Sequence, residues 1–128
     1  MPLLLDTHAQ LWWAAGAAQL SERARAAIAD GGDGVFVSAA SVWEITTKFR
    51  LGKLPSAALL VSNLQGYLVE QNFISLPIDL DHAFRAGGLP GLHRDPFDRI
   101  PIAQALHEGL DFVSNEALFD GYGVRRIW

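Results

Sequence analysis

The sequence predicts an α/β domain built on a parallel sheet with helices on both faces. Short apolar runs alternate along the chain with longer segments of helical periodicity. Because these runs lack the apolar–polar alternation of a half-exposed strand, they are expected to be buried on both faces. The chain has 128 residues, of which 50% are hydrophobic and 19% charged, so we expect one domain over residues 1–128.

The expected strands are short, and about four to five of them should form the central sheet. In a parallel sheet of this kind, ligands bind beyond the carboxyl ends of the strands. The runs that predict strands are Leu3–Leu5, Val35–Val37, Ile74–Leu76, Phe112–Ser114 and Val124–Trp128.

Helix boundaries are indicated by capping residues. Ser, Asp and Asn accept hydrogen bonds from the free N–H groups of a first turn, proline fits the first helical position, and glycine ends a helix. A short helix should also follow Asp6. The other expected helices run from Ser21 to Ala29, from Ser38 to about Leu51, from Ser56 through Leu68, from Asp79 to Gly88 and from Asp95 to Gly109, with a helical turn capped by Asn115.

Two residues in these helices carry further structural expectations. Pro101 lies inside the last long helix, where it has no N–H to bond to the carbonyl of Phe97, and it should kink or loosen the first turns. Trp43 is expected in the core.

Charge and composition exclude several classes of protein. The chain carries 10 Lys and Arg against 14 Asp and Glu, so bulk charge does not indicate nucleic-acid binding, although a local basic rim is compatible with it. It has no Cys, which excludes disulfides and thiolate zinc sites. The most apolar early stretch, Leu11–Ala18, is shorter than a membrane span and follows no basic region. We therefore expect a cytoplasmic protein without membrane contact or signal peptide.

Four acidic residues stand where a site could form. Asp6 directly follows the first strand, and Glu116 lies two residues beyond the fourth. Asp98 lies four residues before Ile102, on the stripe of its helix that faces the core. Glu44 lies at the border of the apolar stripe of its own helix.

Each of these acids also has a purely structural interpretation. Asp6 could cap the next helix, and Asp98 could be a capping-box carboxylate in a first turn. Glu44 could form a surface ion pair with Lys48, four residues on, and Glu116 could lie in the first turn of a short helix. Position alone leaves both interpretations open.

Together the four carboxylates can converge at one edge of the sheet. Two carboxylates about 4 Å apart repel by roughly 4 kcal/mol at an effective dielectric constant near 20, so such a cluster requires a cation. Oxygen ligands favour Mg²⁺ or Mn²⁺, which promote phosphodiester hydrolysis by activating a water. The histidines are too scattered in sequence to indicate a zinc site; they are His8, His82, His93 and His107.

Several segments of the chain form a recognisable set: 3–8 (LLLDTH), 37–45 (VSAASVWEI), 50–54 (RLGKL), 93–99 (HRDPFDR), 102–105 (IAQA), 109–110 (GL) and 122–124 (YGV). In combination they resemble the VapC-type toxins of the PIN-domain family, and the resemblance covers essentially the whole chain. It implies a PIN-like three-layer α/β/α fold.

The resemblance also implies a function and a site. Proteins of this type are Mg²⁺- or Mn²⁺-dependent endoribonucleases that cleave RNA, often tRNA or ribosomal RNA. They act as bacterial toxins, are neutralised by a VapB-like antitoxin and are commonly homodimers. By position, Asp6, Glu44 and Asp98 match the three main acidic metal ligands. Glu116 is the nearest match to the fourth, which is usually Asp, and Asp95 belongs to the same signature as an N-cap.

Other residues near the motifs are candidates for supporting roles. Thr7 or Ser38 could orient the carboxylates through hydrogen bonds. The basic residues that could contact phosphates are Lys48, Arg50, Lys53, Arg94, Arg99, Arg125 and Arg126.

Three rival interpretations imply other functions. A haloacid-dehalogenase-like phosphatase would have Asp-x-Asp-x-Thr after the first strand, whereas Thr7 and His8 follow Asp6 here. A phospho-receiver domain needs an acceptor Asp after a middle strand, where only the helix-capping Asp79 is near. The third is a catalytically inactive PIN-like module that binds a partner. Pro101 and the glutamate at the fourth acidic position keep this alternative open.

Overall fold

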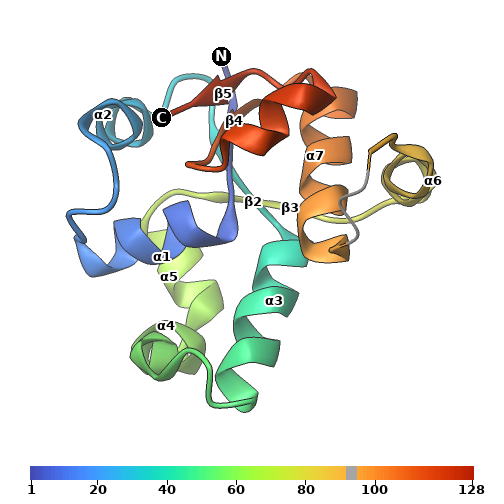
Figure 1. The fold of residues 1–128 in the computed structure, drawn as a ribbon. Helices are drawn as coiled ribbons and strands as arrows, with labels where there is room; N and C mark the ends of the chain where they lie inside the picture. Colours follow the sequence, from blue (N-terminus) through green and yellow to red (C-terminus); the bar gives the residue numbers. More distant parts are fainter. Residues whose placement is uncertain (92–94) are drawn as a thin grey trace.

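The computed structural model describes residues 1–91 and 95–128. His93 and Arg94 lie outside the described residues. Helices and strands alternate as expected, and the helices surround a central sheet (Figure 1). In chain order the elements are β1 Leu3–Leu5, α1 Thr7–Ala15, α2 Glu22–Asp30, β2 Val35–Ser38, α3 Ala39–Arg50, η1 Pro55–Ala57, α4 Ala58–Ser62, α5 Leu64–Glu70, β3 Ile74–Leu76, α6 Leu80–Gly88, α7 Pro96–Glu108, β4 Asp111–Val113, η2 Ala117–Tyr122 and β5 Arg126–Ile127.

The sheet has five strands, all parallel, in the order β3-β2-β1-β4-β5. Leu3 of β1 lies opposite Val35 of β2 on one side and Asp111 of β4 on the other. Neighbouring strands are therefore added on both sides of β1, which is the point where the strand order reverses. In a sheet of this topology, the ligand site forms beyond the carboxyl end of that strand. The expected three-layer α/β/α architecture is confirmed.

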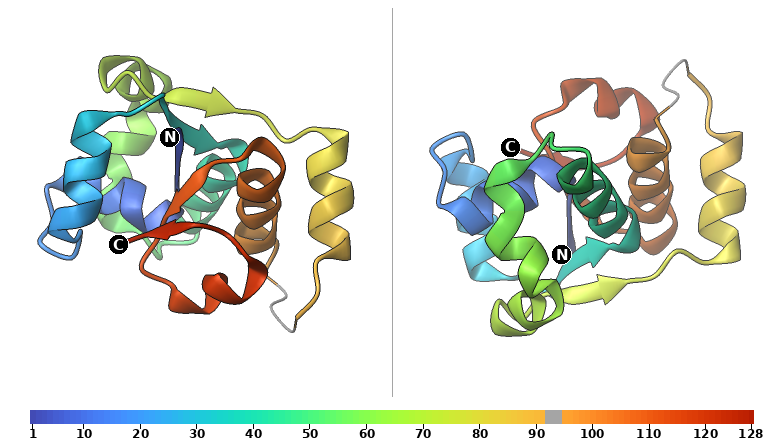
Figure 2. Two further views of the ribbon diagram at one scale, coloured as in Figure 1. Left: turned by 90° about the horizontal axis from the view of Figure 1, so that it is seen from above. Right: turned by 90° about the horizontal axis from the view of Figure 1, so that it is seen from below.

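The side chains of β1 alternate between the two faces of the sheet. Leu3 and Leu5 pack with residues of α1, α2 and α5, whereas Leu4 packs with residues of α7 on the opposite face. Figure 2 shows α1, α2 and α5 on one side of the sheet and α7 on the other. All three leucines are buried, as expected for the central strand of a parallel sheet that is covered on both faces. Asp6, the first residue after it, lies at the boundary between the core and solvent.

The single helix expected from Ser56 is wrong, because the segment folds as η1, α4 and α5. Asn63 separates α4 from α5 with non-helical backbone angles, φ −152° and ψ 59°. Its side chain accepts a hydrogen bond from the N–H of Gly66, so Asn63 caps a new helix instead of continuing the previous one. Leu60 of α4 packs against Ile45 of α3 in a separate core cluster.

Two smaller expectations are also wrong. Trp43 is 52% exposed, and its ring meets the edge of Phe97 with the centroids 4.6 Å apart. The turn after β4 is capped by Glu116 and not by Asn115.

Helix α7 contains Pro101 and is continuous from Pro96 to Glu108. Pro101 is buried, and the helix tolerates the loss of one backbone hydrogen bond near its start. The proline therefore does not end the helix that carries Asp98. Among the described residues, no helix has the length and apolar character needed to cross a membrane.

Candidate metal centre

Asp6 leaves the central strand and caps α1. Its Oδ1 accepts a hydrogen bond from the N–H of Ala9 at 2.7 Å, so the structural interpretation as an N-cap is correct. Burial is the largest influence on this carboxyl and raises its pKa, and the nearby charge of Asp98 raises it further. A hydrogen bond from the Ser114 side chain acts in the opposite direction. Asp6 is therefore a carboxylate whose negative charge is poorly compensated.

Glu44 projects from α3 and is only 5% exposed. Its Oε1 accepts a hydrogen bond from the Thr7 hydroxyl at 2.5 Å. Its Oε2 lies 2.5 Å from the Nζ of Lys48, one turn further along the helix. The expected ion pair with Lys48 exists, but Glu44 itself is buried and not on the surface. Thr7 makes the predicted hydrogen bond to a carboxylate, whereas Ser38 caps α3 through the N–H of Ala40.

Asp98 and Asp95 lie at the start of α7. The half-buried Asp98 is in the first turn, and the exposed Asp95 caps the helix by accepting a hydrogen bond from the N–H of Phe97 at 2.9 Å. Helix α7 packs beside α3, which brings the start of α7 next to Glu44. Three of the four predicted acids thus come together in one pocket of about 120 Å³, lined by Asp6, Thr7, His8, Glu44, Lys48, Asp95, Phe97, Asp98, Pro101 and Phe112.

Glu116 does not line this pocket. It is exposed, and its side chain accepts a hydrogen bond from the N–H of Leu118, which caps η2. Its backbone N–H bonds to the hydroxyl of Ser114, the buried residue that also contacts Asp6. Ser114 is the site residue that the sequence analysis missed, and its place at the carboxyl end of a predicted strand was the available signal.

Replacement of Glu116 by Ala should leave metal binding nearly unchanged. The expected cost is the loss of a cap on a short 3₁₀ helix, less than about 1 kcal/mol of unfolding free energy. Thermal melts with and without Mn²⁺ measure both effects. Loss of the Mn²⁺-induced rise in Tm would show that Glu116 reaches the metal after all.

The donor set of the pocket suits a hard divalent cation. The lining offers the carboxylates of Asp6, Glu44 and Asp98, beside the exposed N-cap Asp95 and the imidazole of His8, and it includes no thiolate. The raised pKa of Asp6 indicates that a nearby positive charge would be favourable. Mg²⁺ and Mn²⁺ accept such ligands while keeping several waters, so the residues present fit either ion.

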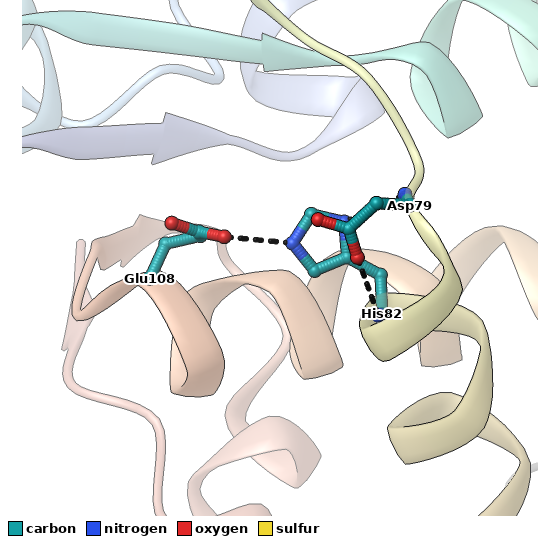
Figure 3. A group of neighbouring side chains, drawn as sticks. All are labelled: Asp79, His82 and Glu108. Carbon is teal, nitrogen blue, oxygen red and sulfur yellow. Dashed lines mark hydrogen bonds and ion pairs between the residues drawn. The ribbon is translucent and has the colours of Figure 1, made fainter.

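A second group of titratable side chains joins α6 to α7. Figure 3 shows Asp79, His82 and Glu108 with their side chains close together. His82 is 1% exposed, and its Nε2 lies 2.9 Å from Oε1 of Glu108. Its Nδ1 lies 3.1 Å from the backbone nitrogen of Asp79, which completes a capping box at the start of α6.

The hydrogen bonds determine the role of this second group. Because the N–H of Asp79 donates to Nδ1 of His82, Nε2 is the ring nitrogen that carries a hydrogen and donates it to Glu108. Both ring nitrogens are therefore used, and they point in different directions (Figure 3). The arrangement is a buried clamp between two helices and offers no free nitrogen to a metal.

Comparison with known families settles which family the chain represents. The model of the PIN domain family matches residues 3–124. The chain belongs to the PIN-domain family. PIN domains are generally nucleases, and the acidic pocket of this PIN domain lies where the sheet topology places a ligand site. No curated protein matches the chain.

Solved structures support the same fold. VapBC2 from Rickettsia felis, bound to a DNA fragment from its promoter, has a TM-score of 0.73 at 14% identity, with 100% of both chains covered. FitAcB from Neisseria gonorrhoeae has a TM-score of 0.70 at 20% identity, with 98% of this chain and 96% of that chain covered. A toxin–antitoxin complex from Klebsiella pneumoniae has a TM-score of 0.58 at 17% identity, with 89% and 86% covered.

Proposed function

We propose that this PIN domain is a metal-dependent endoribonuclease and the toxin of a VapBC-type toxin–antitoxin system. The observation that carries the proposal is the convergence of Asp6, Glu44 and Asp98 in one pocket beyond the central strand. These residues come from three different elements, so their convergence depends on the whole fold. A carboxylate-lined pocket on a nuclease fold suits hydrolysis of a phosphodiester.

In this mechanism the residues in and around the pocket have two roles, holding the metal ion and orienting its ligands. Asp6, Glu44 and Asp98 would hold Mg²⁺ or Mn²⁺, which supplies an activated water and neutralises charge on the phosphate. Thr7 and Ser114 orient two of the carboxylates by hydrogen bonding to Glu44 and Asp6. No side chain needs to act as a covalent nucleophile in this scheme.

The basic residues divide into those held within the protein and those open to a substrate. The guanidinium of Arg99 donates to the carbonyls of Ala86 and Leu89, and that of Arg126 pairs with Asp120. Their hydrogen bonds stabilise the fold and are not available to phosphates. Arg50 and Lys53, exposed near the end of α3, are better candidates for contacts with the RNA backbone. Arg125 is exposed but pairs with Asp111 at the amino end of β4, the edge of the sheet opposite Asp6.

The proposed partners are a VapB-like antitoxin, a second copy of the chain and a tRNA or ribosomal RNA substrate in the cytoplasm. The solved complexes of similar fold support the antitoxin. Exposed apolar side chains support a protein partner, since Leu80 and Phe84 lie one turn apart on α6 and are 87% and 83% exposed.

The alternative is a catalytically inactive partner-binding module. Two observations favour it: Pro101 lies in the wall of the pocket, and Glu116 is directed away to cap η2. An inactive module would still bind its antitoxin, but it would cleave no RNA.

RNA cleavage by the purified protein tests the proposed function. Total RNA would be incubated with EDTA, Mg²⁺ or Mn²⁺, and Asp98→Asn would be compared with Asp81→Asn, an exposed acid on α6. We expect cleavage only with metal, lost in Asp98→Asn and retained in Asp81→Asn. Metal-independent cleavage, or equal cleavage by Asp98→Asn, would contradict the proposal. Absence of cleavage under all conditions would favour the inactive module.

A further inference from the structure

The side chain of Lys48 lines the acidic pocket. Its ammonium lies 2.5 Å from Oε2 of Glu44 and forms part of the pocket lining. Asp95 and Asp98 line the same pocket, so the ammonium also faces their negative charges. One cation therefore faces several carboxylates in the metal-free protein.

Both oxygens of Glu44 already have partners. Oε1 accepts the hydroxyl of Thr7, and Oε2 accepts the ammonium of Lys48. A divalent cation held by Oε2 would share that oxygen with the ammonium of Lys48. Two cations beside one carboxylate oxygen repel each other, so metal binding through Oε2 favours withdrawal of Lys48.

Lys48 is able to leave without unfolding the helix. Its side chain is 36% exposed, and the flexible four-carbon stem can turn the ammonium toward solvent. Glu44, by contrast, is buried and held by Thr7, so the carboxylate stays in place while its cation changes.

We propose that Lys48 is an exchangeable counter-ion, which neutralises Glu44 in the metal-free protein and is displaced when a divalent cation binds. This inference deepens the proposed function, since it takes the pocket as the cation site. It explains how a buried glutamate is accommodated without metal. It also implies that Lys48 competes with the metal and lowers its affinity.

The reactivity of the two lysines tests this exchange directly. Lys48 and Lys53 are the only lysines in the chain, and the exposed Lys53 serves as an internal reference. In wild-type protein without metal, acetylation of Lys48 should be several-fold slower than that of Lys53, by mass spectrometry. Saturating Mg²⁺ should accelerate acetylation of Lys48 and leave Lys53 unchanged. Unchanged protection of Lys48 with bound Mg²⁺ would overturn the inference.

A substitution provides the second measurement. Lys48→Met should bind Mn²⁺ about tenfold more tightly in isothermal titration, because the competing cation is gone. Lys53→Met is the matched control and should bind like wild type. Equal or weaker binding by Lys48→Met would contradict displacement. If the wild-type protein binds no Mn²⁺, both this inference and the proposed function fail. If the protein cleaves RNA while Lys48 stays protected from acetylation in the presence of metal, only the displacement of Lys48 is rejected.

Discussion

Replacing Asp6 by Asn should abolish metal binding and RNA cleavage while leaving the metal-free fold at least as stable as wild type. Burial, and secondarily Asp98, raises the pKa of Asp6, so the ionised carboxylate destabilises the metal-free protein. Asn removes the charge and still accepts the hydrogen bond from Ala9 as an N-cap. We expect cleavage to fall by about 100-fold or more, because a group that stabilises the metal and the transition state is lost.

Thermal melts with and without Mn²⁺ measure both parts of this prediction. Asp95→Asn is the matched control, since Asp95 is also an N-cap on the pocket wall but is exposed. Wild type and Asp95→Asn should be stabilised by Mn²⁺, and Asp6→Asn should not. An Asp6→Asn protein that keeps the full Mn²⁺ stabilisation would exclude Asp6 as a ligand.

The pH dependence of the same melts follows from the sign of the shift. The folded-state pKa of Asp6 is raised, so the folded protein holds this proton more tightly than the unfolded chain does. The penalty for ionisation is fully present above the folded-state pKa, decreases as the pH falls below it, and is gone below the pKa of the unfolded chain. Metal-free wild type should therefore approach the stability of Asp6→Asn in acid. The Mn²⁺ effect on wild type should shrink over the same range, because protons compete with the metal.

His82→Ala should destabilise the protein by about 2–4 kcal/mol. The substitution opens a cavity between α6 and α7, removes the hydrogen bond to Glu108 and leaves the N–H of Asp79 without its acceptor. Urea denaturation gives the free energy of unfolding. His107→Ala, which alters a more exposed neighbour on α7, should cost much less.

A loss below about 1 kcal/mol for His82→Ala would mean that the clamp contributes little. The same variant separates a clamp from a zinc site. If the clamp is purely structural, Zn²⁺ will not raise the Tm of wild type through this group. A Zn²⁺ stabilisation present in wild type and absent in His82→Ala would contradict the hydrogen-bond assignment.

Much of the fold could be predicted because the residues of a strand or a helix cap determine that element through contacts within the element itself. The all-apolar strand Leu3–Leu5 and the capping residues Ser21 and Asp79 determine their elements without distant partners. The apolar stripe continues across Asn63 and so predicts no break there, and only the preference of Asn for N-cap positions indicates one. The exposure of Trp43 depends on where α7 packs, which no local pattern reveals.

The candidate site was predictable where a residue's position on its element determines where its side chain lies. Asp6 at a strand end and Asp98 in a first turn belong to that class. The position of Glu44 on its helix does not distinguish it from a surface residue, since its burial comes from contacts with other helices, and only the family resemblance singled it out. The direction of the Glu116 side chain depends on the conformation of the loop after β4. This loop begins one residue earlier than expected, because β4 ends at Val113. The partner of His82 lies 26 residues away in sequence.

The location of a bound ion tests the central claim most directly. Crystals of the protein soaked in Mn²⁺ would be measured at a wavelength where manganese scatters anomalously. We predict one or two peaks within coordination distance of Asp6, Glu44 and Asp98, with the ammonium of Lys48 withdrawn from Glu44. An empty pocket at saturating Mn²⁺, or a peak only beside His82 and Glu108, would contradict the account.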